Sequence, residues 1–299
     1  MRPLKLKRHL TNEQDRALRS PVPLDAEEKH FDPENFVGPY EDAEAYKEDG
    51  TLLFRVVADA FDMKHVLKAY EHLRTVNGDP TTRTSVTGGG RVTRPRADGT
   101  PSRQSRSSKA KSEEYKKKGV KADFLGYMDR EPGFPFCRQT AWTAKNPEVL
   151  KNCWKLINKA DSWFQKLIPD RHKFQGDHID EHLDFTLGAT VFSTVTVNKK
   201  LSTTYHRDKN DLKGGFGVMF TLGDFTGGQL VFPAFRCAVD YQPGSIILAD
   251  VHETHGNLKN IVGNRITCVL YAREKINECG TAEEELERAK GMDIFGRED

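Results

Sequence analysis

The sequence predicts an α+β fold in which helices of the N-terminal half support a double-stranded β-helix, also called a jelly roll. Two helical patterns lie before residue 170, whereas five short segments after residue 189 are rich in β-branched and aromatic residues. Turn residues separate these segments, and no helical pattern lies between them. Several short strands in succession without intervening helices are typical of a sandwich or barrel.

The two helices are predicted from apolar residues that recur every three or four positions. The first spans 56–76 and ends at Asn77-Gly78, a common helix stop. The second spans about 147–168, where Pro147 suits the first turn and Pro169 suits the end. Each helix carries one apolar stripe, so each is expected to pack on the β core.

The five strands are predicted from a period of two in short apolar segments that Gly, Pro, Asn and Asp separate. Their composition is that of half-buried strands rather than helices. The segments are VFSTVTV (191–197), GVMFTL (217–222), QLVFP (229–233), SIILAD (245–250) and ITCVLYA (266–272).

Changes in composition divide the chain into four parts. Residues 1–78 are a polar N-terminal arm and the first helix, packed on the core. Residues 79–119 form a basic, disordered insert, because the stretch from Arg83 to Lys118 has 11 Lys or Arg against 3 Asp or Glu and almost no large apolar residue. Residues 120–280 form the catalytic jelly-roll domain, and residues 281–299 form a charged helix or tail.

Bulk composition argues against several classes of protein. The net charge is only +2, and no apolar run approaches the ~20 residues that a membrane span needs, so we expect no membrane partner. We expect a monomer in an intracellular, reducing compartment, the nucleus, although the basic N-terminus is too short to establish a nuclear address. The scattered cysteines indicate reduced thiols and no disulfide framework; they are Cys137, Cys153, Cys237, Cys268 and Cys279.

Two histidines and one aspartate form the candidate metal site. His206 and Asp208 lie two residues apart, so on an extended segment their side chains point to the same side. His255 follows the predicted strand 245–250 and supplies a third ligand from a neighbouring strand. Two histidines and one carboxylate on one face leave three coordination positions open, which is the arrangement of non-haem Fe(II) oxygenases. A keto-acid takes two of these positions and dioxygen takes the third.

Other histidines compete for these roles. The segment HLD (182–184) repeats the HxD spacing, but no strand pattern precedes it, so a solvated or capping segment is the better interpretation. His252 and His255 are both placed to supply the distal ligand. We favour His255 because Arg265 follows it by ten residues.

Arg265 is the candidate anchor for the keto-acid. The last two strands of a jelly roll form a hairpin, so a spacing of ten residues brings the arginine back beside the metal. A guanidinium offers a planar, bidentate partner for the distal carboxylate of 2-oxoglutarate. Thr267 faces the same side and adds a hydroxyl. The alternatives are an ordinary strand-end charge for Arg265 and a plain β-former for Thr267.

The same residues carry a resemblance to a known family. The run from FSTVTVNKKLSTTYHRDKND through GGFGVMFTLGDFTGGQLVFP to PGSIILADVHETHGNLKNIVGNRITCVLYAR resembles the TET/JBP dioxygenases, especially their small fungal members. The segment FCRQTAW (136–142) is also similar to that fungal group. The resemblance covers about residues 130–275 and is strongest over 192–272. The cysteine-rich zinc-binding extension of the animal enzymes is absent, so no structural zinc is implied.

The resemblance implies an oxidoreductase that uses Fe(II), 2-oxoglutarate and O2. It implies oxidation of the methyl group of 5-methylcytosine in DNA to 5-hydroxymethylcytosine, and further to formyl- and carboxylcytosine; in the JBP branch the substrate is thymine. Carried over position by position, His206, Asp208 and His255 are the iron ligands, and Arg265 is the 2-oxoglutarate anchor. Asp211 matches an acidic position that faces the flipped base.

Further contacts follow from the resemblance with alternatives left open. Asn198 faces the pocket or is a turn residue, and Arg138 reaches the co-substrate, a phosphate or a structural ion-pair partner. A base inside a duplex cannot present its methyl to buried iron, so the partner is double-stranded DNA with a flipped methylated base. Tyr205, Phe216 and Phe225 are candidates for stacking on that base, or else are core residues. The basic insert offers phosphate contacts or is a solvated linker.

Other functions stay open. The same fold and metal site serve enzymes that act on N6-methyladenine, RNA or a protein side chain. A non-catalytic nucleic-acid-binding module would have lost ligands, and all of them are present here. A cupin-type enzyme acting on sugars or other small molecules would have more histidines close together than this chain has.

Overall fold

Alternating apolar residues give the central strands two buried faces in the computed structural model. Strand β10 (Gly217–Leu222) directs Val218 and Phe220 into one core cluster and Met219 into another. Its neighbour β14 (Ile246–Ala249) divides in the same way, with Leu248 in the first cluster and Ile247 in the second. The structure describes residues 1–20, 23–78, 80, 94–95, 101–102, 109–131 and 134–290.

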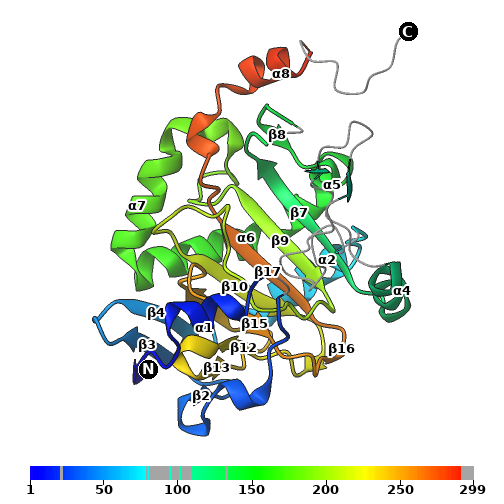
Figure 1. Ribbon diagram of the computed structural model, residues 1–299. Helices are drawn as coiled ribbons and strands as arrows, with labels where there is room; N and C mark the ends of the chain where they lie inside the picture. The colour runs from blue at the N-terminus through cyan, green and yellow to red at the C-terminus, as the bar shows by residue number, and fades with distance from the viewer. Residues whose placement is uncertain are drawn as a thin grey trace.

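The large sheet combines strands from both ends of the chain. Its order is β1-β3-β4-β14-β10-β17-β9-β7-β8 (Figure 1), and β10 pairs antiparallel with both β14 and β17. Strands β9 and β17 are also antiparallel, so the end of β9 at Lys199 lies beside the start of β17 at Ile266. The bounds of the remaining strands are β1 (Arg2–Leu6), β3 (Ala43–Lys47), β4 (Leu52–Val57), β7 (Lys121–Met128), β8 (Arg138–Gln139), β9 (Thr194–Lys199) and β17 (Ile266–Tyr271).

A second sheet of four strands packs against the large one. Its order is β15-β12-β13-β2, formed by β2 (Phe36–Val37), β12 (Leu230–Phe232), β13 (Cys237–Val239) and β15 (Gly256–Asn257). Phe232 stacks on Phe54 of β4, with ring centroids 5.8 Å apart. Two facing sheets with an apolar core between them are the predicted jelly roll, so the α+β prediction is confirmed. Short pairs of strands form at β11 (Phe225–Thr226) with β16 (Val262–Gly263) and at β5 (Arg94–Pro95) with β6 (Pro101–Ser102).

Helices cover the outer face of the large sheet. Apolar residues of α2 (Met63–Leu73) and α6 (Pro147–Leu167), among them Leu73 and Phe164, share one cluster with the sheet. The predicted helix 147–168 is thus confirmed. Within the described residues, no helix is both long and apolar enough to span a bilayer. The other helices are α1 (Asn12–Ala17), α4 (Lys109–Lys118), α5 (Ala141–Lys145), α7 (Pro169–Ile179) and α8 (Ala282–Lys290), with 3-10 turns η1 (Glu28–His30), η2 (Pro33–Asn35), η4 (Asp180–Phe185), η5 (Pro233–Phe235) and η6 (Ile276–Glu278).

Two predictions about the N-terminal part are wrong. Residues 1–50 do not merely lie over the core, because β1 and β3 extend the large sheet from its edge. The helix predicted over 56–76 begins only at Met63, because Val56 and Val57 belong to β4 and pair with β14. Asp62 caps the helix by accepting a hydrogen bond from the main-chain N–H of Lys64 at 2.8 Å.

The basic insert 79–119 falls largely outside the described residues. Its last part is helical as α4. The helix is followed by β7, which pairs with β9 in the large sheet. The insert therefore ends beside the large sheet.

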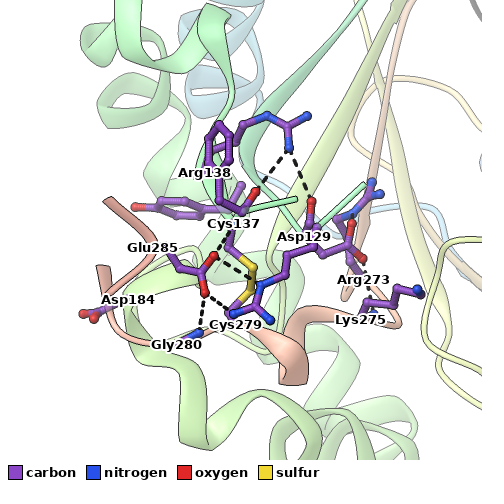
Figure 2. Close-up of a disulfide and its surroundings, with 12 residues drawn as sticks. Asp129, Cys137, Arg138, Asp184, Arg273, Lys275, Cys279, Gly280 and Glu285 are labelled. Atoms are coloured by element: carbon purple, nitrogen blue, oxygen red, sulfur yellow. Dashed lines mark hydrogen bonds and ion pairs between the residues drawn. A yellow bond between two sulfur atoms is a disulfide. The ribbon is translucent and has the colours of Figure 1, made fainter. Parts of the chain in front are cut away.

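The prediction of five reduced cysteines is also wrong. Cys137 and Cys279 form a disulfide with their Cα atoms 5.7 Å apart, whereas Cys153, Cys237 and Cys268 are buried free thiols. Figure 2 shows this bond between the segment that leads into β8 and the segment before α8. Sequence spacing could not reveal it, because the two cysteines lie 142 residues apart and only the fold brings them together.

Loss of this disulfide is expected to destabilise the fold. In a Cys279→Ser variant the free energy of unfolding falls by about 2–4 kcal/mol, because the bond closes a long loop in the unfolded chain. Urea unfolding of oxidised and dithiol-reduced protein measures the difference. Reduction should lower the stability of the wild type to that of the variant and leave the variant unchanged. Equal stability of the oxidised and reduced wild type would contradict the prediction.

A buried carboxylate reinforces the same junction. Glu285 of α8 is 1% exposed and accepts hydrogen bonds from the main-chain N–H groups of Cys137 at 2.6 Å and Gly280 at 2.8 Å. Arg130 forms an ion pair with it. Burial raises the pKa of Glu285, but the hydrogen bonds from Arg130, Gly280 and Cys137 outweigh it, and the pKa falls to about 2.

This lowered pKa predicts a loss of stability in acid. The Glu285 contribution is fully present above its unfolded pKa of 4.5 and is lost as pH falls through about 2. It amounts to at most about 3 kcal/mol. A Glu285→Gln variant is expected to show a flatter dependence of unfolding free energy on pH between those two values. Parallel curves for wild type and variant would be incompatible with the proposed contribution.

Candidate metal centre and co-substrate pocket

Two segments far apart in sequence meet at the candidate metal centre. The main-chain N–H of His206 donates to the carbonyl of His255 at 2.9 Å, and the reciprocal bond measures 3.0 Å. Gly256 permits this approach, because a Cβ there would lie 3.1 Å from the carbonyl carbon of Thr204. The two imidazole rings are consequently close, with centroids 4.3 Å apart.

Asp208 completes a compact group of three potential ligands. Its Oδ1 lies 3.5 Å from Nε2 of His206, and its Oδ2 lies 3.9 Å from Nε2 of His255. All three ligand atoms fall within 4.8 Å of one another, and no other such group of His, Cys, Asp or Glu exists among the described residues. The histidines are buried and Asp208 is partly exposed, so the group lies at the bottom of an opening.

Main-chain carbonyls orient both rings. Nδ1 of His206 lies 2.7 Å from the carbonyl of Thr204, and Nδ1 of His255 lies 3.0 Å from that of Glu253. These partners assign the proton to Nδ1 in each ring and direct the Nε2 lone pairs toward Asp208. Two neutral imidazoles and one carboxylate on one side fit Fe(II) and leave its other positions open.

The competing ligands lie elsewhere. His252 has Nδ1 at 3.5 Å from Asp250 and Nε2 at 3.4 Å from the carbonyl of Asp211, and it is not part of the three-residue group. In the HLD segment, Asp184 accepts a hydrogen bond from the main-chain N–H of Ala282 at the start of α8, at 2.9 Å. That contact is the capping role expected for the segment; the side chain of His182 lies outside the described residues.

Arg265 is almost completely buried, at 1% exposure. Its Nη2 donates to the Tyr241 hydroxyl at 3.2 Å, whereas its Nε and Nη1 have no hydrogen-bond partner among the described residues. A buried guanidinium with two unsatisfied donors is costly unless an anion binds it. Burial raises the pKa of the Tyr241 hydroxyl despite the opposing effect of Arg265, so this hydroxyl stays protonated. The donor set suits a carboxylate such as that of 2-oxoglutarate.

Gly228 leaves room for this guanidinium. Its φ is +74°, and a Cβ at this position would lie 2.7 Å from the Ile261 side chain and 3.0 Å from Nη1 of Arg265. The ring of Phe225 also packs near it, with its centroid 5.6 Å from Cζ of Arg265. The position of Arg265 is therefore fixed by packing before any ligand binds.

A cleft of about 890 Å³ opens over the three candidate ligands. Among its lining residues are predicted site residues Thr267, Asn198, Asp211 and Arg138. Arg138 pairs with Glu131 at 3.1 Å, and its guanidinium lies 4.2 Å from the centroid of Phe134, so the ion-pair alternative accounts for its position. A second cavity of about 630 Å³ lies beside α7 and contains none of the predicted site residues.

The aromatic stacking candidates are not in the cleft, and this part of the sequence interpretation needs correction. Tyr205 is fully buried in a core cluster, and its hydroxyl lies 2.9 Å from Nδ1 of His30. Phe216 is buried in the cluster between sheet and helices, and Phe225 is the ring packed on Arg265. Tyr205 precedes the cleft-lining His206 on an extended segment, so its side chain points the other way.

Several cleft residues escaped sequence reasoning. Tyr241 lies between strands, and its contact with Arg265 arises only from the fold. Arg273 is 3% exposed, and its Nε donates to Asp129 at 2.7 Å while its Nη2 lies 3.3 Å from Glu131. Arg273 lies two residues after the last strand, in the same alternation as Arg265. That spacing was the signal from which its place in the cleft could have been predicted.

Comparisons with known proteins agree with this geometry. Residues 125–274 match the TET/JBP family model, described as the oxygenase domain of the 2-oxoglutarate- and Fe(II)-dependent dioxygenase superfamily. Thymine dioxygenase JBP1 of Trypanosoma brucei brucei is 29% identical over 175 residues, which are 55% of this chain and 20% of that protein. The bifunctional helicase and thymine dioxygenase JBP2 of Trypanosoma brucei brucei is 33% identical over 176 residues, 56% of this chain and 16% of that protein.

The chain thus matches about a fifth or less of the length of these relatives. A likeness of fold extends further along the chain. The solved structure of NgTET1 in complex with 5mC DNA overlaps with a TM-score of 0.56 and 14% identity, covering 84% of this chain and 85% of that one. The overlap therefore includes elements outside the matched domain of residues 125–274.

Proposed function

Because the chain belongs to the TET/JBP family of Fe(II)- and 2-oxoglutarate-dependent oxygenases, we propose that it oxidises the methyl group of 5-methylcytosine in DNA. The observation that carries the proposal is the meeting of His206, Asp208 and His255 beneath a cleft whose wall adjoins the unsatisfied guanidinium of Arg265. The expected products are 5-hydroxymethylcytosine and then the formyl and carboxyl derivatives.

In this proposal the protein residues hold and orient the reactants. His206, Asp208 and His255 would hold Fe(II), and Arg265 with the Tyr241 hydroxyl would bind the distal carboxylate of 2-oxoglutarate. When bound, the iron and keto-acid supply an oxidant from O2, with succinate and carbon dioxide as by-products. The burial of both histidines and of Arg265 keeps bulk water from the reacting groups.

The choice of base is proposed to depend on Asp211. It is buried and lines the cleft. A carboxylate accepts a hydrogen bond from the exocyclic amino group of cytosine, whereas the corresponding O4 of thymine is an acceptor and would be repelled. An acidic residue beside the flipped base thus favours 5-methylcytosine over thymine.

Thymine is the second candidate substrate. The sequence relatives at 29–33% identity are named thymine dioxygenases, and the family domain matched over residues 125–274 includes all three candidate ligands. Thymine and 5-methylcytosine carry the methyl group at the same ring position, so both present it to the metal in one geometry. The contacts to the group at position 4 and to the neighbouring N3, which carries a hydrogen in thymine and none in 5-methylcytosine, separate them.

Mass spectrometry of nucleosides decides between these substrates. The protein is incubated anaerobically with Fe(II), 2-oxoglutarate and duplexes that carry 5-methylcytosine or only unmodified bases, and air then starts the reaction. We expect 5-hydroxymethylcytosine from the first duplex and no 5-hydroxymethyluracil from either. Exclusive formation of 5-hydroxymethyluracil would replace the proposal by the thymine candidate, and no oxidised pyrimidine from either duplex would refute both.

We propose double-stranded DNA as the partner, bound with the target base flipped into the cleft. A cationic rim, defined as Arg74, Lys121, Lys199 and Lys200, lies where helix α2 ends beside the ends of strands β7 and β9. The two strands also supply Asp123 and Asn198 to the cleft. Burial and then the neighbouring charges of Lys200, Arg74 and Lys121 lower the pKa of Lys199, as expected where positive groups gather; Arg74 also pairs with Glu71 at 2.9 Å. Phosphates of a duplex would supply further negative charge, and a nuclear location follows from such a partner.

Removal of the rim charges is expected to weaken DNA binding in a salt-dependent manner. For a Lys121→Ala/Lys199→Ala double variant, the slope of log K against log salt falls by about 2, because each lost phosphate contact removes about 0.9. Fluorescence anisotropy with a labelled duplex measures it. A Lys151→Ala/Lys173→Ala control removes two exposed lysines that pair with acidic neighbours on α6 and α7. Identical slopes for both variants would mean that the rim does not contact phosphates.

A further inference from the structure

An aspartate from the first helix reaches the segment that carries two of the candidate iron ligands. Asp15 of α1 is completely buried, and its Oδ2 accepts a hydrogen bond from Nη2 of Arg207 at 2.7 Å. Arg207 lies between His206 and Asp208 in the sequence, so a contact to its side chain acts directly on the backbone that presents both ligands.

The same guanidinium also joins the second ligand segment. Nε of Arg207 donates to the hydroxyl of Thr254 at 3.2 Å, and its Nη2 lies 4.0 Å from the carboxylate of Glu253. Thr254 directly precedes His255, and the carbonyl of Glu253 accepts from the ring of His255. Arg207 therefore touches both strands of the bridge on which the metal site is built.

Two cations from the N-terminal part hold Glu253 in turn. Arg8, after β1, contacts its carboxylate at 2.5 Å, and Lys47 at the end of β3 contacts it at 3.1 Å. Lys47 also binds Asp250 at 2.8 Å. The loop 250–255 thus lies between charged groups of residues 1–50 on one side and the ligand segment 206–208 on the other. All of these N-terminal groups lie outside the matched domain of residues 125–274.

Stability alone does not explain the burial of Asp15. Burying a carboxylate costs several kcal/mol, and a well-packed apolar residue stabilises such a position as well or better. Asp15 Oδ1 has no hydrogen-bond partner among the described residues, so the cost is only partly offset by Arg207 and by Arg19 at 3.1 Å. What the ion pair does provide is a fixed direction for Arg207 and, through it, a fixed spacing between the two ligand segments.

We propose that Asp15 is a positioning residue of the metal centre, acting through Arg207 to hold the His206–Asp208 and His255 segments at ligand spacing. The inference rests on the proposed function, because it assumes that these three side chains bind the metal. Residues 1–50 are then part of the metal centre, and a chain reduced to the matched oxygenase domain would bind metal poorly.

The test measures metal affinity without turnover. Co(II) substitutes for Fe(II), is stable in air, and its visible absorption reports the number and geometry of its ligands. We expect Asp15→Asn to weaken Co(II) binding by about 10- to 100-fold and to change the absorption bands, as loss of an outer partner of a ligand does elsewhere. Arg207→Gln is expected to have the same effect, and the double variant should be no weaker than either single one, since both act through one contact.

Asp32→Asn is the matched control. It removes another ion pair between the N-terminal part and the core, that of Asp32 with Arg236, which touches neither ligand segment. Thermal unfolding of the metal-free variants shows whether each still folds, and Asp15→Glu tests rescue by a longer carboxylate. If Asp15→Asn and Arg207→Gln bind Co(II) as tightly as Asp32→Asn does, the positioning role of Asp15 is overturned and the proposed function is not affected. If the wild type binds no Co(II), the iron site of the proposed function is overturned.

Discussion

Replacement of His255 by alanine is expected to abolish both metal binding and oxidation of DNA. The variant loses one of the three proposed protein ligands, so its Fe(II) affinity is expected to fall by more than the ~10- to 100-fold that loss of an outer partner costs. His255 contributes its Nε2 to the group of ligand atoms within 4.8 Å, and its ring orientation is fixed by the Glu253 carbonyl. Anaerobic titration with Fe(II) and mass spectrometry of DNA nucleosides measure the two losses.

His252→Ala supplies the matched control for this experiment. His252 was the competing distal ligand, lies three residues earlier, and is held by Asp250 and by the carbonyl of Asp211. Its hydrogen bond with Asp250 raises its pKa above the ordinary value despite partial burial, which favours the protonated ring that cannot bind a metal. This variant should keep wild-type Fe(II) affinity. The reverse outcome, with loss of metal binding only in His252→Ala, would show that His252 and not His255 is the distal ligand.

The strands and the candidate ligand set could be predicted from sequence because their signals are local. The segment 217–222 coincides with β10, and 266–272 differs from β17 by one residue, since period-two alternation depends only on neighbours along the chain. His206 and Asp208 share a side for the same reason. The distal position needed one more step, the hairpin spacing between His255 and Arg265, and the structure brings His255 to the other two side chains.

What sequence reasoning missed depends on contacts between distant segments. Tyr205 adjoins His206 in sequence, yet the register that turns His206 into the cleft turns Tyr205 into the core against His30. The Cys137–Cys279 bond and the contact of Tyr241 with Arg265 also join elements whose proximity no local pattern encodes. The polar N-terminal arm was misread because its short strands bury residues only after β3 pairs with β4 and β1 pairs with β3.

Loss of the guanidinium in Arg265→Leu is expected to raise the KM for 2-oxoglutarate by about 30- to 5,000-fold. Truncating one partner of a buried, hydrogen-bonded charge pair costs about 2–5 kcal/mol, and each 1.36 kcal/mol is tenfold. The leucine leaves the distal carboxylate of the co-substrate buried without a counter-charge beside Tyr241 and Thr267. Succinate release at varied 2-oxoglutarate concentration measures the effect, and Fe(II) affinity without co-substrate should be unchanged.

Two further variants separate charge from shape in this pocket. Arg265→Lys keeps the positive charge but loses the planar fork, so its KM should lie between those of wild type and Arg265→Leu. Thr267→Val replaces a hydroxyl by a methyl group of similar volume. It should weaken 2-oxoglutarate binding by about 1 kcal/mol. If Arg265→Leu instead kept the wild-type KM for 2-oxoglutarate, the two unsatisfied donors of Arg265 would need another anion. The nearest groups that line the cleft would then have to bind the keto-acid, and among them Arg273 is already paired with Asp129 and Glu131.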